Sequence, residues 1–358
     1  MQERSEWQME KEEISYVLKQ YGLTPRFIET FGKVRRIYTD RGVFALKKIT
    51  VRDGGEFIRR MQYLYQRGFN RIVPVFPTID GRYGVLYDKY LYYLMPWLPN
   101  ELKEDHDERH KQMFRELARL HALSAQEVPV DREERTQFYE RTMKEWEKDG
   151  EFLDGFLEQC EQRTYMSPFE LLYCLCYNDI RQALRFSVRK FSEWYEKVKD
   201  LEKGRMILVH GKISPEHFLY DERGFGFFSN FEESRLGSPL HDLLPFLSRI
   251  VQKYPKKYDE CIDWLYTYFK FFPLREEEMS LFLSYFAYPG PAIRELEKIF
   301  HAARKNEYRN VQKLQRQYWR LKNIEYIVMR VDEIERQKKL EAELKKDGQY
   351  EDDGALAD

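Results

Sequence analysis

The side chains that could bind a metal ion or move a proton are concentrated between Met206 and Leu247. Carboxylate and amide oxygens are ligands for hard cations such as Mg²⁺, an imidazole nitrogen suits softer metals, and an ammonium group can only donate hydrogen bonds. The segment mixes all of these types, so its chemistry depends on which of them share one site. In chain order the residues concerned are His210, Gly211, Lys212, His217, Asn230, Glu232 and Asp242.

The local pattern predicts how this segment folds. An apolar run that ends at Tyr220 and a second one from Phe225 to Glu232 flank the polar turn Asp221–Gly224, which indicates a hairpin. Asp242 stands at the start of an apolar helical pattern. We expect its carboxylate to accept backbone N–H groups from the helix start or from the His210 loop, a structural role whose loss costs roughly 1 kcal/mol for a capping residue.

The order of these residues resembles the catalytic core of the aminoglycoside and choline kinase-like phosphotransferases. That superfamily carries His-Gly-Asp-x-x-x-x-Asn, then a hairpin, then Ile-Asp-Phe-Glu, and finally Gly-Asp-Pro and an Asp that opens a helix. The resemblance implies a structural role for His210, Gly211 and Asp242. The residues that match in order and spacing are His210, Gly211, Phe231, Glu232, Gly237, Pro239 and Asp242.

The chain departs from this pattern at three chemical positions. Lys212 replaces the catalytic Asp, His217 replaces the metal-binding Asn, and Asn230 replaces the metal-binding Asp. Phosphoryl transfer depends on positioning and on charge stabilisation by magnesium, which prefers carboxylate oxygens. A lysine acts as a base only if burial strongly depresses its pKa, and the nearby acids Glu216 and Glu232 oppose that. We therefore expect no catalytic residue and no metal ion here.

The first hundred residues alternate between strand and helix patterns. Three strand patterns, one helix and two further strands follow each other, which is the order of the small lobe in a kinase-like fold. The patterns after Pro99 are helical. The strands are expected at Phe27–Ile28, Val34–Tyr38, Val43–Lys47, Gly84–Tyr87 and Tyr92–Trp97, and the helix at Gly55–Gly68.

We therefore predict an α+β, bilobal protein-kinase-like fold with a small β-rich lobe and a large helical lobe. The small lobe, with an N-terminal helix, covers residues 1–99, and the large lobe covers 100–340 with the altered core at 206–247. Residues 341–358 are nearly all charged, Gly or Ala, which predicts a disordered tail.

Lys47 is a candidate for cofactor binding. Phe-Ala-Leu-Lys47 is similar to the kinase strand whose lysine contacts phosphates, although Lys48 follows and an exposed strand lysine is an equal alternative. A kinase pairs this lysine with a helical glutamate, and the expected helix offers only Glu56. Glu232 is the second candidate for contact with a cofactor.

Bulk composition excludes several classes of function. A net charge of −1 gives no basic field for nucleic acid. The four cysteines fit neither a zinc site nor a disulfide framework, which favours synthesis in the reducing cytoplasm. No apolar run is long enough to span a bilayer and no signal peptide is expected, so we predict no membrane insertion.

Within the superfamily, three motifs resemble the bacterial spore-coat proteins of the CotS and YutH type. They are His-Gly-Lys-Ile-Ser from His210, Ser-Asn-Phe-Glu ending at Glu232, and Ser-Pro-Leu-His-Asp-Leu around Asp242. The resemblance implies a protein that is made in the mother-cell cytoplasm, is assembled into the spore coat and has other coat proteins as partners.

Three functions are consistent with these residues. The altered positions favour a pseudokinase that serves as a structural or interaction module and needs no cofactor. The alternative is an active phosphotransferase that uses Mg-ATP and non-standard residues on a small molecule or a protein. The third is a protein that binds an anionic ligand, because Lys212 and Lys47 could place positive charge where magnesium would lie.

Overall fold

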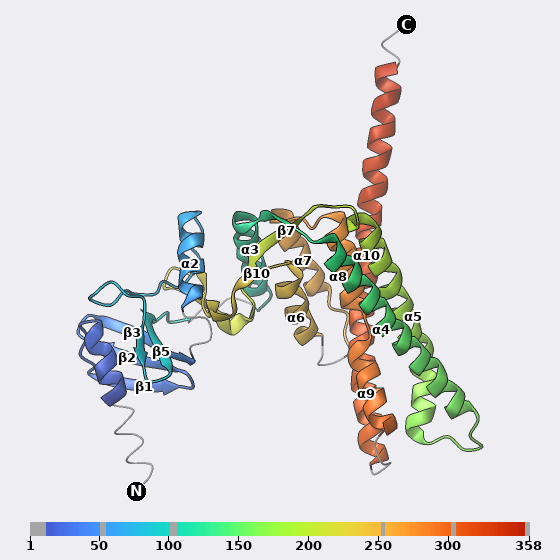
Figure 1. Cartoon of the computed structure of the whole chain (residues 1–358), viewed down its shortest axis with the longest axis horizontal. Helices are drawn as coiled ribbons and strands as arrows, with labels where there is room; N and C mark the ends of the chain where they lie inside the picture. The colour runs from blue at the N-terminus through green and yellow to red at the C-terminus, as the bar shows by residue number, and fades with distance from the viewer. Residues whose placement is uncertain (1–11, 51–54, 101–105, 252–254, 302–305, 355–358) are drawn as a thin grey trace. The chain divides into compact units, whose positions relative to one another are not determined.

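The computed structural model describes residues 12–50, 55–100, 106–251, 255–301 and 306–354 (Figure 1). The chain divides into two compact units. The first unit comprises Met1–Ala125 and Met206–Asp242, and the second comprises Gln126–Arg205 and Leu243–Asp358. The segment that carries the chemical motif thus belongs to the same unit as the N-terminal sheet, and the division does not fall at residue 99.

The first unit contains a five-stranded antiparallel sheet with the order β1-β2-β3-β5-β4. Helix α2 lies between β3 and β4 in the chain and buries Phe57, Met61 and Leu64, which recur at helical spacing. The predicted order of three strands, one helix and two strands is confirmed. The bounds are β1 Phe27–Phe31, β2 Val34–Thr39, β3 Gly42–Thr50, α2 Glu56–Gln66, β4 Val85–Tyr87 and β5 Tyr90–Pro96.

A helix at residues 12–20 covers part of this sheet. Its apolar residues Ile14, Val17 and Leu18 belong to one buried cluster with Ile37 of β2 and Leu94 of β5. Burial of these apolar side chains between the helix and the sheet stabilises this part of the first unit. Residues 1–11, where no signal peptide is expected, lie outside the described residues.

The remaining part of the first unit carries the motif. Strand β9 is joined to the chain after α2, because Val73 N–H donates to the Phe228 carbonyl and Phe228 N–H donates to the Arg71 carbonyl, each at 2.8 Å. The predicted hairpin β8–β9 is confirmed, but its second strand ends at Phe228. The elements are α3 His106–Ser124, β7 Lys203–Val209, η1 Pro215–His217, β8 Phe218–Tyr220, β9 Gly226–Phe228, η2 Phe231–Glu233 and β10 Arg235–Gly237.

The chain turns sharply after the hairpin. Asn230 adopts a left-handed conformation with φ of 68°, and residues 231–233 form the single 3₁₀ turn η2. The prediction of a strand through Glu232 is wrong here, since a residue at positive φ cannot continue a β-ladder. Strand β10 then pairs antiparallel with β7, Arg235 opposite Val209.

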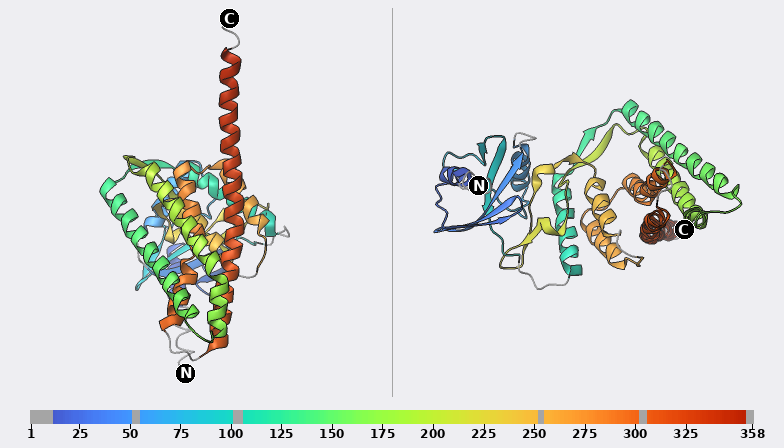
Figure 2. Two further views of the ribbon diagram at one scale, coloured as in Figure 1. Left: turned by 90° about the vertical axis from the view of Figure 1, so that its right-hand side faces the viewer. Right: turned by 90° about the horizontal axis from the view of Figure 1, so that it is seen from below.

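The second unit is mostly helical. Helices α4 and α5 lie side by side in both views of Figure 2. Asp131 caps α4, and a capping box of Ser167 and Glu170 with Pro168 at the first turn begins α5. The elements are β6 Gln126–Pro129, α4 Arg132–Glu161, α5 Pro168–Val198, α6 Leu240–Ile250 (which begins in the first unit), α7 Asp259–Phe271, α8 Glu276–Ala287, α9 Gly290–His301 and α10 Glu307–Gly354.

The last helix differs from its prediction. Helix α10 continues to Gly354, so residues 341–354 are helical where a disordered tail is predicted. Leu340 and Leu344 are exposed on it, which agrees with the predicted solvated helix end. The final residues, 355–358, lie outside the described part of the chain.

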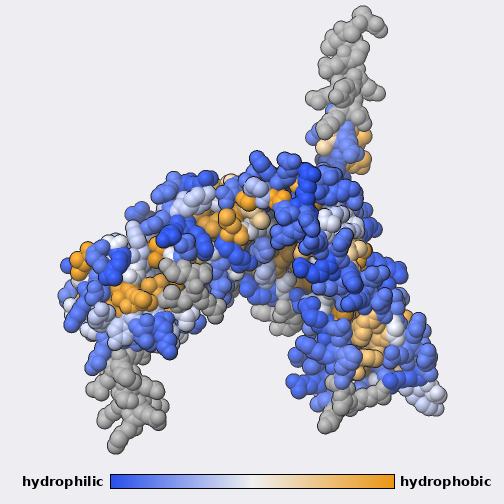
Figure 3. Space-filling view, viewed as in Figure 1, coloured by the Kyte–Doolittle hydropathy of each residue, from blue (hydrophilic) through white to orange (hydrophobic). Residues whose placement is uncertain are grey.

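The hydropathy of the surface and the state of the cysteines can be compared with the expectations from composition. The face seen in Figure 3 is hydrophilic over most of its area and has only small separate hydrophobic patches. None of the helices in the described ranges has the length and hydropathy to cross a membrane. No disulfide joins any of the four cysteines, as predicted.

Candidate functional site

The carboxylate of Asp242 organises the motif segment. It is 2% exposed, its Oδ2 accepts the His210 N–H at 2.7 Å, and its Oδ1 accepts the Gly211 N–H at 2.8 Å. These are the hydrogen bonds predicted from the His210 loop. A third partner, His121 Nε2 of α3, lies 3.1 Å from Oδ2. Burial alone would raise the pKa of Asp242, but the hydrogen bond and charge of His121 and the contact with His210 hold it below its usual value.

His210 is fully buried beneath this carboxylate. Its Nε2–H donates to the Ser229 carbonyl at 2.7 Å, and its Nδ1 accepts the Lys212 N–H at 3.3 Å. Both ring nitrogens are therefore satisfied in one neutral tautomer. Burial lowers the pKa of His210, which keeps the ring neutral. The ring therefore connects the His210 loop to the end of the hairpin through hydrogen bonds.

Gly211 is required at its position by both conformation and space. Its φ is +83°, and a Cβ placed there would lie 2.3 Å from the Glu233 carbonyl oxygen. Only glycine tolerates this φ without strain, and only glycine lets the two backbones approach so closely. The loop and η2 are thereby held against each other.

Lys47 occupies the centre of the neighbouring polar cluster. It is 7% exposed, so the alternative of an exposed strand lysine is wrong. Its ammonium lies 2.5 Å from the Glu232 carboxylate and donates to the Asn230 side-chain carbonyl. Tyr93 of β5 donates its hydroxyl to the same carboxylate at 2.5 Å. Glu56, the only acid of the predicted helix, pairs with Arg59 on its own helix.

The ionisation states follow from these contacts. Burial alone would raise the pKa of Glu232, but the charge of Lys47 and the hydrogen bonds from Lys47 and Tyr93 hold it below its usual value. Burial lowers the pKa of Lys47, and Glu232 opposes that change. Burial and the charge of Glu232 raise the pKa of Tyr93 well above its usual value, so the phenol stays a donor. The result is an internal ion pair.

The other two altered positions lie beside this pair. Lys212 is exposed, and its charge contributes to the lowered pKa of Lys47. His217 donates from Nδ1 to the Lys212 carbonyl at 2.8 Å, which leaves Nε2 as its acceptor nitrogen. Burial, followed by the charges of Lys47 and Lys212, lowers the pKa of His217. The structure thus brings Lys47, Lys212 and Asn230 to one site.

An open cavity of about 510 Å³ lies over the pair, within the first unit. This is a volume typical of small-molecule sites. Five basic side chains and two carboxylates line it, which leaves an excess of three positive charges. They are Lys33, Lys47, Arg60, Lys212, Arg235, Glu232 and Glu233.

Magnesium does not fit these donors. The Glu232 carboxylate and the Asn230 carbonyl are both engaged by Lys47, and Lys212 faces the same cavity. A divalent cation would have to displace an ammonium group from its only two oxygen partners here. Among the described residues, no three His, Cys, Asp or Glu side chains are placed together to hold a metal ion. These side chains therefore suit an anion without a metal ion better than a nucleotide that is bound together with magnesium.

Comparison with solved structures identifies the fold. An aminoglycoside phosphotransferase from Alicyclobacillus acidocaldarius superimposes with a TM-score of 0.64 at 14% identity, covering 89% of this chain and 96% of that chain. The AMP-bound complex of a spectinomycin phosphotransferase gives 0.50 at 14% identity, covering 89% and 98%. The chain therefore has the kinase-like α+β fold of these structures, as predicted.

Comparison at the level of sequence gives the family. Residues 6–263 match the model of the phosphotransferase enzyme family, which is more than half of the chain. The chain belongs to this family. No curated protein matches it.

Two parts of the site are missed by the sequence prediction. The helical spacing of His121 with Phe114, Leu117 and Leu120 predicts a packing residue, yet His121 also contacts Asp242. Because Glu232 lies two residues after Asn230, a strand would place both on one face, but the two residues reach Lys47 from a turn. The sequence signal for the ion pair is this acid near Asn230, the position where the chain lacks the carboxylate of the family pattern.

Proposed function

We propose that this member of the phosphotransferase family is a pseudokinase that does not transfer phosphate with magnesium. The observation that carries the proposal is the occupation of Lys47 by Asn230 and Glu232. Lys47 contacts the two side chains that stand at and beside the metal-binding position of the family pattern, and not a helical glutamate as in a kinase. The same two side chains are thereby withdrawn from any metal ion.

Charge at the altered positions supports this proposal. Two aspartates in the family pattern contribute −2, whereas Lys212 and Asn230 contribute +1. A unit charge at about 4 Å is worth roughly 4 kcal/mol at an effective dielectric constant of 20. The change in the electrostatic energy of a divalent cation at this site is therefore large compared with ordinary ligand-binding energies.

The test is a pair of measurements on the full chain: ATP hydrolysis, and nucleotide binding with and without magnesium. We expect no turnover and no gain in nucleotide affinity from magnesium in the wild type. Lys212→Asp combined with Asn230→Asp should introduce magnesium-dependent binding, and Glu222→Gln in the hairpin turn is the matched control. Wild-type turnover that Glu232→Gln abolishes would instead support the active phosphotransferase, with Glu232 as its metal ligand.

We propose further that the protein serves as a structural or interaction module of the endospore coat. The three motifs that resemble the spore-coat proteins support this role, with synthesis in the mother-cell cytoplasm and other coat proteins as partners. A fluorescent fusion in a spore-forming bacterium that encodes the chain tests it. Fluorescence that stays diffuse in the mother cell and never surrounds the developing spore would contradict the coat role.

A second candidate function is the binding of an anionic ligand in the cavity over Lys47 without a metal ion. The excess of basic side chains around this cavity favours it. Pyrophosphate should bind more tightly in EDTA than in excess magnesium, because magnesium competes for the anion. Lys212→Ala should weaken binding, while Lys89→Ala, at an exposed turn, should not.

A further inference from the structure

A separate polar cavity lies in the second unit. It has a volume of about 200 Å³ and is formed by α6, α8, α9 and α10 together with the connection between α8 and α9. It has no residue in common with the cavity over Lys47. Its polar lining consists of Ser248, Tyr285, Tyr288, Arg294, Gln317 and Arg320.

The two arginines in this cavity differ in exposure, since Arg294 is exposed whereas Arg320 is half-buried. Neither Arg294 nor Arg320 forms an ion pair or a side-chain hydrogen bond with any other described residue. The Nε of Arg320 is buried without a partner, and so is Oε1 of Gln317. Buried polar atoms without partners are rare in folded proteins, because each costs about 1–3 kcal/mol.

The arginines are also close enough to influence each other. Burial lowers the pKa of Arg320, and the charge of Arg294 lowers it further. The acid near Arg294 is Asp149, which accepts the Tyr288 hydroxyl. Burial raises the pKa of Asp149, while the Tyr288 hydrogen bond and the charge of Arg294 oppose that rise, so Asp149 partly balances the charge of Arg294.

We propose that this cavity binds a phosphate group, either free phosphate or the phosphate of a small monoester. The donors come from three helices, since Ser248 lies on α6, Arg294 on α9 and Arg320 on α10. Donors that converge from three directions match the oxygens of a tetrahedral phosphate better than the two oxygens of a planar carboxylate. Oε1 of Gln317 would accept the proton of a monoprotonated phosphate.

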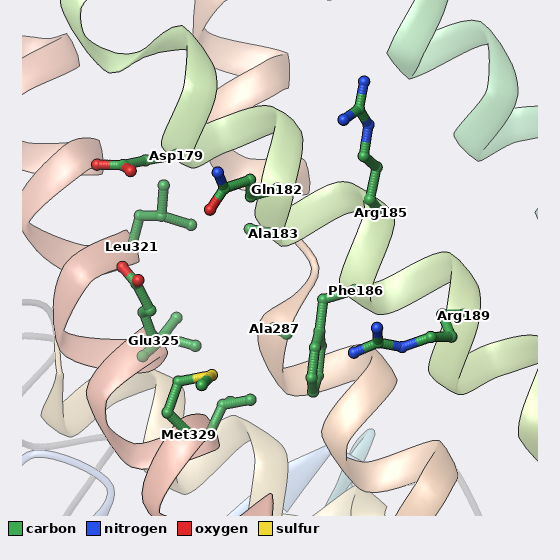
Figure 4. A pocket seen from close by; sticks show the side chains of 12 residues that line it. Asp179, Gln182, Ala183, Arg185, Phe186, Arg189, Ala287, Leu321, Glu325 and Met329 are labelled. Atoms are coloured by element: carbon green, nitrogen blue, oxygen red, sulfur yellow. The ribbon is translucent and has the colours of Figure 1, made fainter.

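The adjoining pocket differs from this cavity in its formal charge. That pocket, of about 270 Å³, shares Leu321 and Ile324 with the arginine cavity. Figure 4 shows Asp179 and Glu325 on one of its sides, with Phe186 and Ala287 farther in. Its two carboxylates are balanced by Arg185 and Arg189, so its formal charge is zero, whereas two arginines and no described acidic residue line the arginine cavity.

The test measures phosphate binding to the full chain by calorimetry, with inorganic phosphate and glycerol 3-phosphate as probes and acetate as the planar control. Arg294→Gln and Arg320→Gln should each weaken phosphate binding by about tenfold to a hundredfold, the cost of a charged hydrogen bond. Arg316→Gln, which changes an exposed arginine on α10, is the matched control. Lys212→Ala should leave this binding unchanged, which separates it from any anion bound in the first unit.

A thermal readout distinguishes binding from a structural role. Arg320→Gln removes a half-buried charge whose Nε has no partner, so the melting temperature without phosphate should not fall, while the rise on adding phosphate should disappear. Free phosphate and the monoester are distinguished by which probe binds more tightly. Equal binding of acetate, unchanged binding in Arg320→Gln, loss of binding in Lys212→Ala, or no phosphate binding at millimolar concentration would each overturn the proposal.

Discussion

Two carboxylates in the first unit, one buried and one half-buried, have different partners. Asp242 accepts backbone N–H groups from His210 and Gly211, so it holds the shape of a loop. Glu232 holds the Lys47 side chain, a group that could otherwise contact a ligand. The first arrangement keeps the family pattern, and the second replaces it.

The difference shows that the structural and chemical parts of a phosphotransferase motif are separable. The loop conformation depends on Gly211, His210 and Asp242 and needs no metal ion. The ion pair, in contrast, is made by side chains alone, since the Lys47 ammonium contacts the side-chain oxygens of Asn230 and Glu232. Once Lys212 and Asn230 stand at the chemical positions, an internal ion pair can satisfy the buried lysine without disturbing the loop.

The largest expected effect comes from Asp242→Ala. This change leaves two backbone N–H groups and His121 without their acceptor in a buried site, so we expect a loss of about 3–5 kcal/mol in the free energy of unfolding. That is more than the cost of a helix cap. Urea unfolding measures it, with Glu222→Gln as an exposed control. A loss below about 1 kcal/mol would show that Asp242 is not central to the loop.

A smaller effect is expected at the ion pair. Lys47→Met and Glu232→Gln each leave one buried charge without its opposite, so each should cost about 2–4 kcal/mol. The double variant should cost less than the sum of the two, which a double-mutant cycle measures. Additive costs would mean that the two side chains do not stabilise each other.

Two glycines with the same φ allow the energetic effect of the close contact between Gly211 and Glu233 to be measured separately. Gly211 and Gly68 both have φ of +83°, but a Cβ at Gly68 meets nothing within 4 Å. Gly68→Ala should therefore cost about 1 kcal/mol from conformation alone. Gly211→Ala should cost roughly 1–3 kcal/mol more because of the contact with Glu233. Equal unfolding free energies in the two variants would contradict the proposed packing.

The smallest effect is the dependence of stability on pH. Because the pKa of His210 is lowered in the fold, the unfolded chain takes up a proton first as the pH falls below about 6.5. Stability should then decrease by on the order of 1 kcal/mol. Glu232 and Asp242 have lowered pKa values, so their stabilisation is present above their unfolded pKa and is lost under more acidic conditions.

Urea unfolding between pH 8 and pH 4 tests this order. His217 also has a lowered pKa and acts in the same direction. His217→Gln should therefore reduce the first decrease without removing it. If that variant showed no decrease between pH 7 and pH 5.5, the assignment to His210 would be wrong. Glu232→Gln should flatten only the part below about pH 4.5.

Local patterns are sufficient to predict most of the first unit. Alternating apolar residues and glycine turns determine β1 to β5, and spacing determines α2. The hydrogen bonds of Asp242 also follow from its place after the loop and before a helix. These features depend on neighbours in the chain, which the sequence displays directly.

The ion pair could not be predicted in the same way. Lys47 and Glu232 are far apart in the chain, and their contact depends on the left-handed turn at Asn230, which no strand pattern reveals. Glu56, the only acid that the predicted helix offers, pairs with Arg59 on its own helix. The end of α10 could not be predicted either. Its polar composition predicts disorder, although the residues up to Gly354 are helical.

The position of the cysteine thiols allows opening of the second unit to be measured separately from damage to the first. All four cysteines, at 160, 174, 176 and 261, lie in the second unit, whereas the variants of the loop and of the ion pair lie in the first. Burial raises the pKa of Cys160 to about 12 and that of Cys176 to about 11, so alkylating reagents should react with them slowly while the helices stay closed. The rate of alkylation in Asp242→Ala would therefore report whether damage to the loop opens the helical unit or leaves it intact.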